Sequence, residues 1–164
     1  MKAIDLVRWA MRMTDESVRR LVEDMRDAPL TQPTSRGGNH PLWTMGHLAY
    51  IEGNVPPILF GEPHPLRHWE KLFGTGSHPV TDPAGYPPFD EVVATYRDLR
   101  AKNLKRLEEV DDAGLDRLPV AIPPGFEDAM KTFGHTFLLI TLHQMVHYGQ
   151  IADARRVAGR APLM

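Results

Sequence analysis

Most prolines of this 164-residue chain, and more than half of its glycines, lie in three tracts, and that segregation constrains the fold more than any other feature of the sequence. Proline lacks the N–H group that a helix needs, and glycine loses more backbone freedom than any other residue when a helix forms. The largest tract, residues 61–88, holds six prolines and four glycines. Smaller tracts at residues 29–41 and 119–125 help to divide the remaining sequence into four long segments.

Each of the four segments carries apolar residues spaced three and four apart, which predicts an amphipathic helix. The expected helices cover residues 2–27, 41–54, 89–110 and 128–158. Pro41 suits the first position of the second helix, with Asn39 or His40 as its cap, and Gly159 suits the end of the last helix. A short helical piece is expected at residues 65–73, inside the long proline-rich loop.

Four amphipathic helices without a strand pattern predict an all-α protein, a four-helix bundle that forms a single domain over residues 1–164. A chain of this length can bury about 70% of its unfolded surface, so a core can form without disulfides. Long loops are expected between helices two and three and between helices three and four. The first of these loops is long enough for a crossover in place of a simple up-and-down order.

The composition argues against several classes of function. The chain has no cysteine, which excludes disulfides, thiolate metal ligands and cysteine nucleophiles. Its net charge of −2 gives no reason, from bulk charge, to expect binding to nucleic acid or to an anionic membrane. The first residues lack the apolar stretch of a signal peptide, and no apolar run is long enough to span a bilayer. We therefore expect a cytoplasmic protein.

Two histidines, His143 and His147, stand four residues apart in the apolar segment TLHQMVHYGQI of the last expected helix. Residues at this spacing project side by side, and here they share the stripe that faces the bundle. The pair is compatible with a metal site, an acid–base pair or two core histidines with hydrogen-bond partners. A metal site needs a third ligand, and His47 in the middle of the second helix is the best candidate. His135 lies about 12 Å along the helix from His143, which is too far.

The segments HPLWTMGHLAYIEGN, residues 40–54, and LHQMVHYGQIADARRVAGRAP, residues 142–162, resemble the two signature regions of the DinB-like superfamily. The resemblance covers almost the whole chain in its layout of four helices and a long second loop. Its most specific element is the H-x-G-Q-I sequence at residues 147–151. The resemblance implies a four-helix bundle that binds a divalent metal ion through three histidines, which correspond here to His47, His143 and His147.

The superfamily includes DNA-damage-inducible proteins and metal-dependent thiol transferases, so the resemblance implies a metal-dependent enzyme with a small-molecule substrate. The expected reaction is transfer of a low-molecular-weight thiol to an electrophile. The alternatives are metal-dependent hydrolysis and a non-catalytic metal-binding module in a stress response. Zinc, nickel and iron all accept a set of three histidines. Related sulfur-oxygenating enzymes carry an acidic residue where this chain has Gly149, which counts against an oxygenase.

The positions of three other residues on the expected helices indicate how each relates to these histidines. Glu52 lies well around the helix from His47 and is interpreted as a surface carboxylate, which leaves the site without an obvious general base. Gln150 is either a partner of the histidines or a solvated side chain. Gly149 is interpreted as a point where a neighbouring helix or side chain approaches closely.

A homodimer is also expected. The first helix carries a continuous apolar stripe, and the long loop contains Trp69, Phe73 and Tyr86, which we expect to be exposed. Members of the DinB-like superfamily often pair, so the resemblance implies the same assembly.

Overall fold

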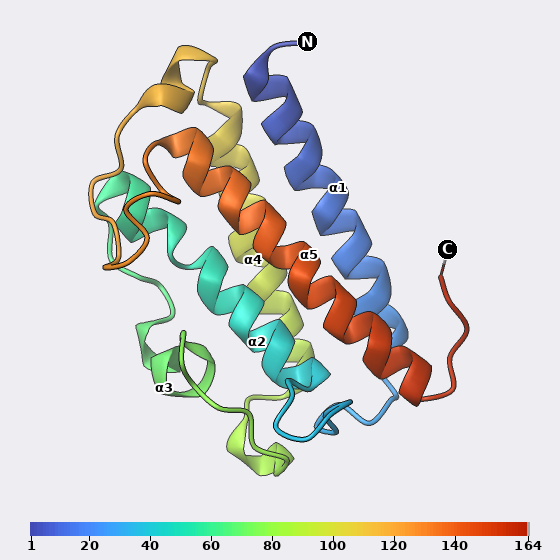
Figure 1. Ribbon diagram of the computed structural model, residues 1–164. Coiled ribbons are helices and arrows are strands. Elements are labelled where there is room, and N and C mark those ends of the chain that lie inside the picture. The colour runs from blue at the N-terminus through green and yellow to red at the C-terminus, as the bar shows by residue number, and fades with distance from the viewer. Residues whose placement is uncertain (164) are drawn as a thin grey trace.

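The computed structural model describes residues 1–163, and four long helices make up most of it (Figure 1). They are α1 (Ala3–Asp24), α2 (Pro41–Glu52), α4 (Phe89–Glu108) and α5 (Phe133–Val157). The connections contain the short helix α3 (Glu70–Phe73) and helical turns at Pro56–Phe60, Arg67–Trp69, Pro83–Gly85 and Ala113–Asp116. No strand occurs within residues 1–163, so the prediction of an all-α bundle is confirmed.

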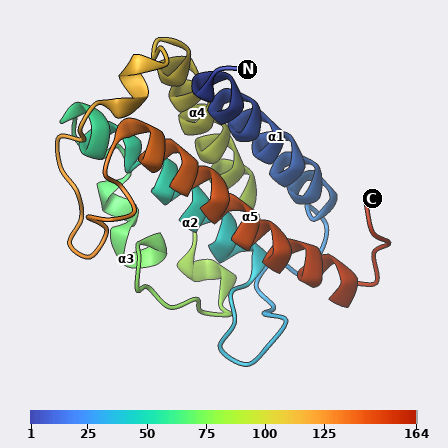
Figure 2. The same cartoon turned by 45° about the horizontal axis from the view of Figure 1, so that its top comes forward.

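The four long helices pack in the order α1, α5, α2, α4 around the bundle (Figures 1 and 2). Helices α1 and α5 run in one direction, and α2 and α4 run in the other. The neighbours α2 and α4 are therefore parallel, and the loop between them returns the chain along the length of the bundle. The long proline-rich tract makes this return, so the bundle does not have a simple up-and-down order.

Helix α2 begins where the sequence predicts, with Pro41 in its first position and His40 as its cap. The Nδ1 atom of His40 accepts a hydrogen bond from the Trp43 N–H (3.1 Å). Its Nε2 atom lies 2.8 Å from the Val80 carbonyl oxygen, which ties the start of α2 to the returning loop. The helix ends at Glu52, shortly before the prolines that cannot continue it.

Helix α5 begins at Phe133, later than the expected Asp128. The residues before it form turns, and the side chain of Thr132 accepts a hydrogen bond from the His135 N–H, as an N-cap does. Gly159 has a φ of 75° and ends the helix as predicted.

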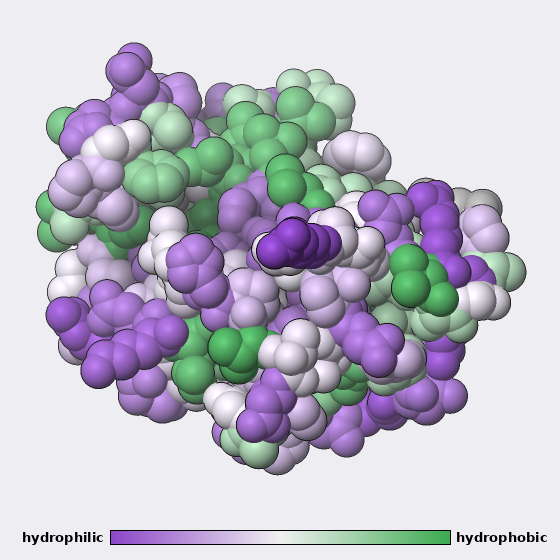
Figure 3. Space-filling model, turned by 60° about the horizontal axis from the view of Figure 1, so that its bottom comes forward, coloured by the Kyte–Doolittle hydropathy of each residue, from purple (hydrophilic) through white to green (hydrophobic). Residues whose placement is uncertain are grey.

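The expectation that the aromatic residues of the long loop are exposed is wrong, because two of the three are buried and the third, Tyr86, is half-buried. Trp69 and Phe73 are 5% and 0% exposed and belong to the apolar cluster around α2. They lie in the predicted short helical piece, which the structure confirms as the turn Arg67–Trp69 followed by α3. The face of the molecule drawn in Figure 3, turned so that the bottom of Figure 1 comes forward, is largely polar, with apolar side chains gathered mainly in its upper part. Within residues 1–163, no helix is both long and apolar enough to cross a membrane.

A layer of buried polar side chains crosses the middle of the bundle, between two apolar clusters. The layer contains Thr14 of α1, Glu52 of α2, Arg100 and Asn103 of α4, and Gln144 of α5. The Glu52 side chain is 1% exposed, and its carboxylate accepts hydrogen bonds from Arg100 Nη1 (2.9 Å) and Asn103 Nδ2 (2.8 Å). It also accepts one from Gln144 Nε2 (2.9 Å), and Arg100 Nη2 donates to Thr14 Oγ1 (2.9 Å). The interpretation of Glu52 as a surface carboxylate is therefore wrong.

Arg100→Met is expected to lower the free energy of unfolding by about 3–5 kcal/mol, because it leaves the buried Glu52 carboxylate without its counter-ion. Arg12→Met is the matched control. Arg12 pairs with Glu108 at 3.1 Å, but the two side chains are 58% and 57% exposed, and such pairs contribute about 1 kcal/mol or less. Urea unfolding followed by circular dichroism measures both variants. If the two variants lost equal amounts of unfolding free energy, the central role of the buried pair would be contradicted.

Candidate metal centre

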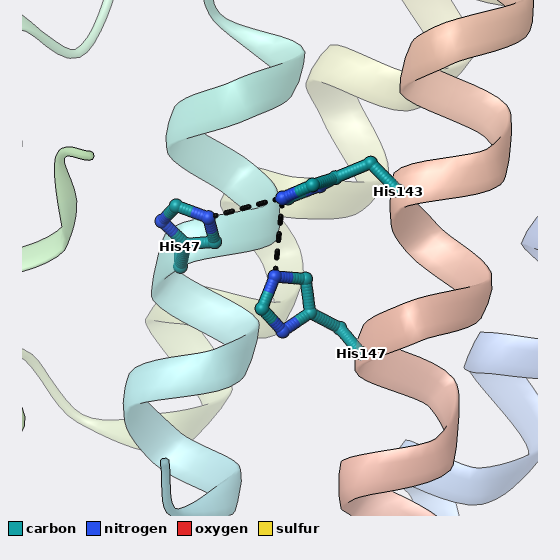
Figure 4. A group of neighbouring side chains, drawn as sticks. All are labelled: His47, His143 and His147. Carbon is teal, nitrogen blue, oxygen red and sulfur yellow. Dashed lines mark hydrogen bonds between the residues drawn. The ribbon is translucent and has the colours of Figure 1, made fainter. Parts of the chain in front are cut away.

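Three histidine side chains converge between α2 and α5 (Figure 4). The Nε2 atom of His143 lies 3.4 Å from Nε2 of His47 and 3.2 Å from Nε2 of His147. One ring nitrogen from each residue lies within 4.8 Å of the other two. The structure thus brings together the three residues that the sequence and the resemblance single out.

The ring of His47 is held by its surroundings. Its Nδ1 atom lies 2.7 Å from the Phe73 carbonyl oxygen. A carbonyl oxygen can only accept, so Nδ1 carries the proton and Nε2 presents its lone pair to the other histidines. The Trp43 indole stacks on the ring, with 4.7 Å between the centroids and 9° between the planes. Both contacts limit how far the ring can turn.

Gly46 allows the Phe73 segment to come this close to α2. A Cβ atom at Gly46 would lie 2.1 Å from the Phe73 ring, so a larger residue would displace that ring. The carbonyl of the same Phe73 then meets His47, the next residue of the helix. The sequence signal for this contact, not used in the prediction, is a glycine directly before a histidine in an apolar helix.

His147 is oriented by Gln150, which follows it on α5. The Oε1 atom of Gln150 lies 2.8 Å from His147 Nδ1 and accepts a second hydrogen bond from Asn39 Nδ2 at 3.2 Å. Because Oε1 accepts, Nδ1 of His147 donates, and its Nε2 atom presents a lone pair. The structure therefore supports Gln150 as a partner of a histidine. The Nδ1 atom of His143 is buried and has no hydrogen-bond partner in residues 1–163.

Burial favours the neutral form of all three imidazoles. Desolvation is the largest cause, and it lowers the pKa of His47 and of His143 to about 4. It also lowers the pKa of His147, although the hydrogen bond to Gln150 acts in the opposite direction. A neutral His143 can place one proton on Nε2 between the two facing lone pairs of His47 and His147, whereas a cation accepts the lone pairs of all three rings at once. This arrangement favours a bound cation.

The donor set fits a divalent transition-metal ion. Zinc–nitrogen bonds of about 2.0–2.1 Å in a tetrahedral arrangement place the ligand nitrogens about 3.3 Å apart. The separations of 3.2 Å and 3.4 Å between Nε2 of His143 and the other two rings agree with that value, and all three nitrogens lie within 4.8 Å of one another. Imidazole suits zinc, nickel and iron alike, so the three rings select a class of ion and not one element.

A cavity of about 620 Å³ lies beside the histidines, and His47 and His143 form part of its wall. Most of the remaining wall is apolar and includes Trp43, Ile51, Ile58, Met130, Leu139 and Ile140. Tyr50, Asn54 and Thr75 add polar groups. Among the described lining residues, Glu70 is the single carboxylate, and it is exposed to solvent. A small molecule in this cavity would lie against the histidines.

Two further histidines, one of them the His135 that spacing had excluded, lie apart from the three rings. His64 packs on Tyr50, with 4.4 Å between the ring centroids, and His135 is exposed at the start of α5. The expected close approach at Gly149 is wrong. A Cβ atom there would have no heavy atom of the described chain within 4 Å, apart from its immediate surroundings on the helix.

Comparison with known proteins shows the family to which the chain belongs. The sequence model of the DinB superfamily matches residues 10–151. The chain belongs to the DinB superfamily. Among solved structures, this DinB-superfamily chain is similar to YfiT from Bacillus subtilis, with a TM-score of 0.63, 20% identity, and coverage of 96% of this chain and 89% of that one. YfiT is described as a probable metal-dependent hydrolase with an unusual four-helix bundle topology. No functionally curated protein matches the chain.

The stability of the metal-free protein is expected to fall as the pH decreases from about 6.5 to about 4. The pKa values of His47 and His143 are about 4 in the folded chain and 6.5 ordinarily, so the unfolded chain takes up protons first. Each histidine then lowers the free energy of unfolding by up to about 1.4 kcal/mol per pH unit in that range. Above pH 6.5 this contribution is complete. Urea unfolding with a chelator, repeated across the pH range, measures the slope.

Two variants make this measurement specific to the site. His143→Gln removes one of the titrating groups and is expected to give a shallower slope. His135→Gln changes an exposed histidine of the same helix and is expected to keep the original slope. An unchanged slope in His143→Gln would show that the ring is not desolvated as described.

Proposed function

We propose that this chain is a metal-dependent enzyme with a small-molecule substrate, and that His47, His143 and His147 hold its divalent ion. The observation that carries the proposal is the convergence of three neutral imidazole nitrogens, 3.2 Å and 3.4 Å apart, beside a cavity. A divalent ion bound there would supply a Lewis acid that makes a bound water or thiol a nucleophile near neutral pH. The candidate ions are zinc, nickel and iron.

The surrounding residues have separate roles in this proposal. Phe73 and Gln150 fix the protonated nitrogens of two rings and thereby keep the opposite nitrogens free to bind. The apolar wall excludes water from one side of the site, which strengthens its electrostatic interactions. Three neutral ligands leave the ion its full charge, which favours an anionic nucleophile or leaving group.

We propose thiol transfer to an electrophile as the reaction, with hydrolysis as the second candidate. A bound thiolate needs no general base, and the cavity offers one carboxylate among its described lining residues, the exposed Glu70. Hydrolysis is favoured by a different observation, the likeness in fold to YfiT and the description of that protein as a probable metal-dependent hydrolase.

The protein purified without an affinity tag is expected to contain about one divalent ion per chain, measured by mass spectrometry. His47→Ala and His143→Ala are expected to weaken metal binding by at least tenfold, because each removes a ligand of three. The control His135→Ala, which changes an exposed histidine, is expected to retain the ion. A chain that takes up no metal, even after reconstitution with zinc, nickel or ferrous iron, would overturn the proposal.

The reaction is tested on the metal-loaded protein with two panels. One panel measures conjugation of several cellular thiols to a chloro-aromatic electrophile, and the other measures hydrolysis of nitrophenyl esters. Thiol transfer predicts turnover in the first panel that disappears in His143→Ala. Turnover in the second panel alone would favour hydrolysis, and bound metal without turnover in either would favour a non-catalytic metal-binding module.

We also propose that two copies of the chain pair through the outer face of α1 and α5. Seven large apolar side chains on these neighbouring helices have exposed fractions between 40% and 62%: Leu6, Trp9, Met13, Leu138, Leu142, Met145 and Val146. No charged residue occurs on α5 between His135 and Asp153. A stable interface buries about 800 Å² of each partner, and contiguous exposed apolar patches on a protein surface mark such interfaces. The exposed Gly149 lies on the same charge-free side and would let a partner helix approach.

Leu142→Glu is expected to convert a dimer into a monomer, because it places a charge in the middle of this apolar face. Light scattering coupled to gel filtration measures the mass. Leu118→Glu changes a leucine that is 77% exposed in the loop before α5, outside the face, and is expected to leave the mass unchanged. A monomeric parent protein at micromolar concentration would contradict the proposed pairing.

A further inference from the structure

We propose that the cavity beside the histidines binds the apolar body of its substrate, an alkyl or aryl group, while a polar reactive end reaches His47 and His143. This inference rests on the proposed function, because it names the substrate class of the same site. The observation behind it is the composition of the cavity wall. Side chains from α2, from the turn Pro56–Phe60, from the loop before α5 and from α5 itself meet around one apolar space.

The wall is built by buried side chains of the core. Ile58, Met130 and Ile140 are 4%, 8% and 2% exposed, so packing fixes them before any ligand arrives. A volume of about 620 Å³ lies within the range of pockets that enclose a drug-sized molecule, which is about 300–1,000 Å³. The cavity can therefore enclose more than the atoms that react at the histidines.

The same wall disfavours a highly polar substrate. No lysine or arginine lines the cavity in the described part of the chain, and the polar groups are few: Tyr50, Asn54, Glu70 and Thr75 beside the histidines. A substrate with many hydroxyl or charged groups would leave most of them without partners, and unpaired polar groups in an apolar space are costly. An apolar body instead gains free energy for each methylene that leaves water.

The chain-length dependence of binding tests this inference. A series of n-alkyl hydroxamates, from two to ten carbons, is titrated into the zinc-loaded protein by calorimetry, with the hydroxamate as the metal-binding end. We expect the affinity to rise about two- to fourfold per methylene until the cavity is full. An affinity that does not depend on chain length would overturn the inference.

A second measurement uses the metal-free protein. Here n-alkanols displace a neutral fluorescent dye, N-phenyl-1-naphthylamine, and longer chains are expected to displace it at lower concentration. Zinc binding without any chain-length dependence would overturn this inference and leave the proposed function intact. Length-dependent displacement in a chain that binds no metal would support the apolar cavity and overturn the proposed function.

Leu139→Gln places an amide in the cavity wall and is expected to weaken binding of the longest hydroxamate at least tenfold, with little effect on the shortest. The control Leu118→Gln makes the same chemical change at an exposed leucine outside the wall and is expected to change neither. Should Leu139→Gln fail to fold, Leu139→Phe serves instead. It keeps the wall apolar and fills part of the cavity, so the hydroxamate that binds most tightly is expected to have a shorter alkyl chain. If the folded variants bound every hydroxamate of the series with the affinity of the parent protein, the assignment of this cavity as the binding site would be overturned.

Discussion

Glu52 and Arg100 bring a negative and a positive charge into the middle of the bundle, where the two side chains are each 1% exposed. Desolvating two charges is costly, so such a pair persists only where further hydrogen bonds surround it. Here Asn103 and Gln144 donate to the carboxylate, and Thr14 accepts from the guanidinium. The bonds join all four long helices. Sliding any one helix along its axis would break bonds to a buried charge, so the layer fixes the helices in one register.

The candidate metal centre depends on that register. Glu52 follows His47 on α2, and its partner Gln144 comes directly after His143 on α5. The hydrogen bond between Glu52 and Gln144 therefore holds the two helices at the level where the histidine rings meet. A displacement of one turn, about 5.4 Å, would remove the bond and would also separate nitrogens that now lie 3.4 Å apart. The core layer and the site are thus parts of one constraint.

The sequence predicted what depends on one helix at a time, and the family resemblance supplied the meeting of His47 with the last helix, but the buried polar layer shared by all four helices was not predicted. The spacing of His143 and His147 is a local property, as is the cap at His40, and both could be read directly from the chain. Glu52 was misplaced because its burial depends on Arg100, which resembles a residue of a solvated helix face until its partners are known. The missed signal was that a polar residue interrupts the apolar pattern of each long helix at the same level, as Thr14 and Asn103 do.

The surroundings of the histidines bear on the three interpretations that the sequence left open. An acid–base pair works best with a pKa near the working pH, whereas burial brings the pKa of His47 and His143 to about 4, so both rings are neutral at pH 7. Core histidines would satisfy both ring nitrogens, yet Nδ1 of His143 has no partner in the described chain. Phe73 and Gln150 hold the protons on Nδ1 of His47 and His147, so the Nε2 lone pairs of both rings point at the single Nε2 atom of His143. A cation shared by the three rings would satisfy the inward-facing nitrogens together. The metal-site interpretation therefore accounts for more of the observed geometry than either alternative.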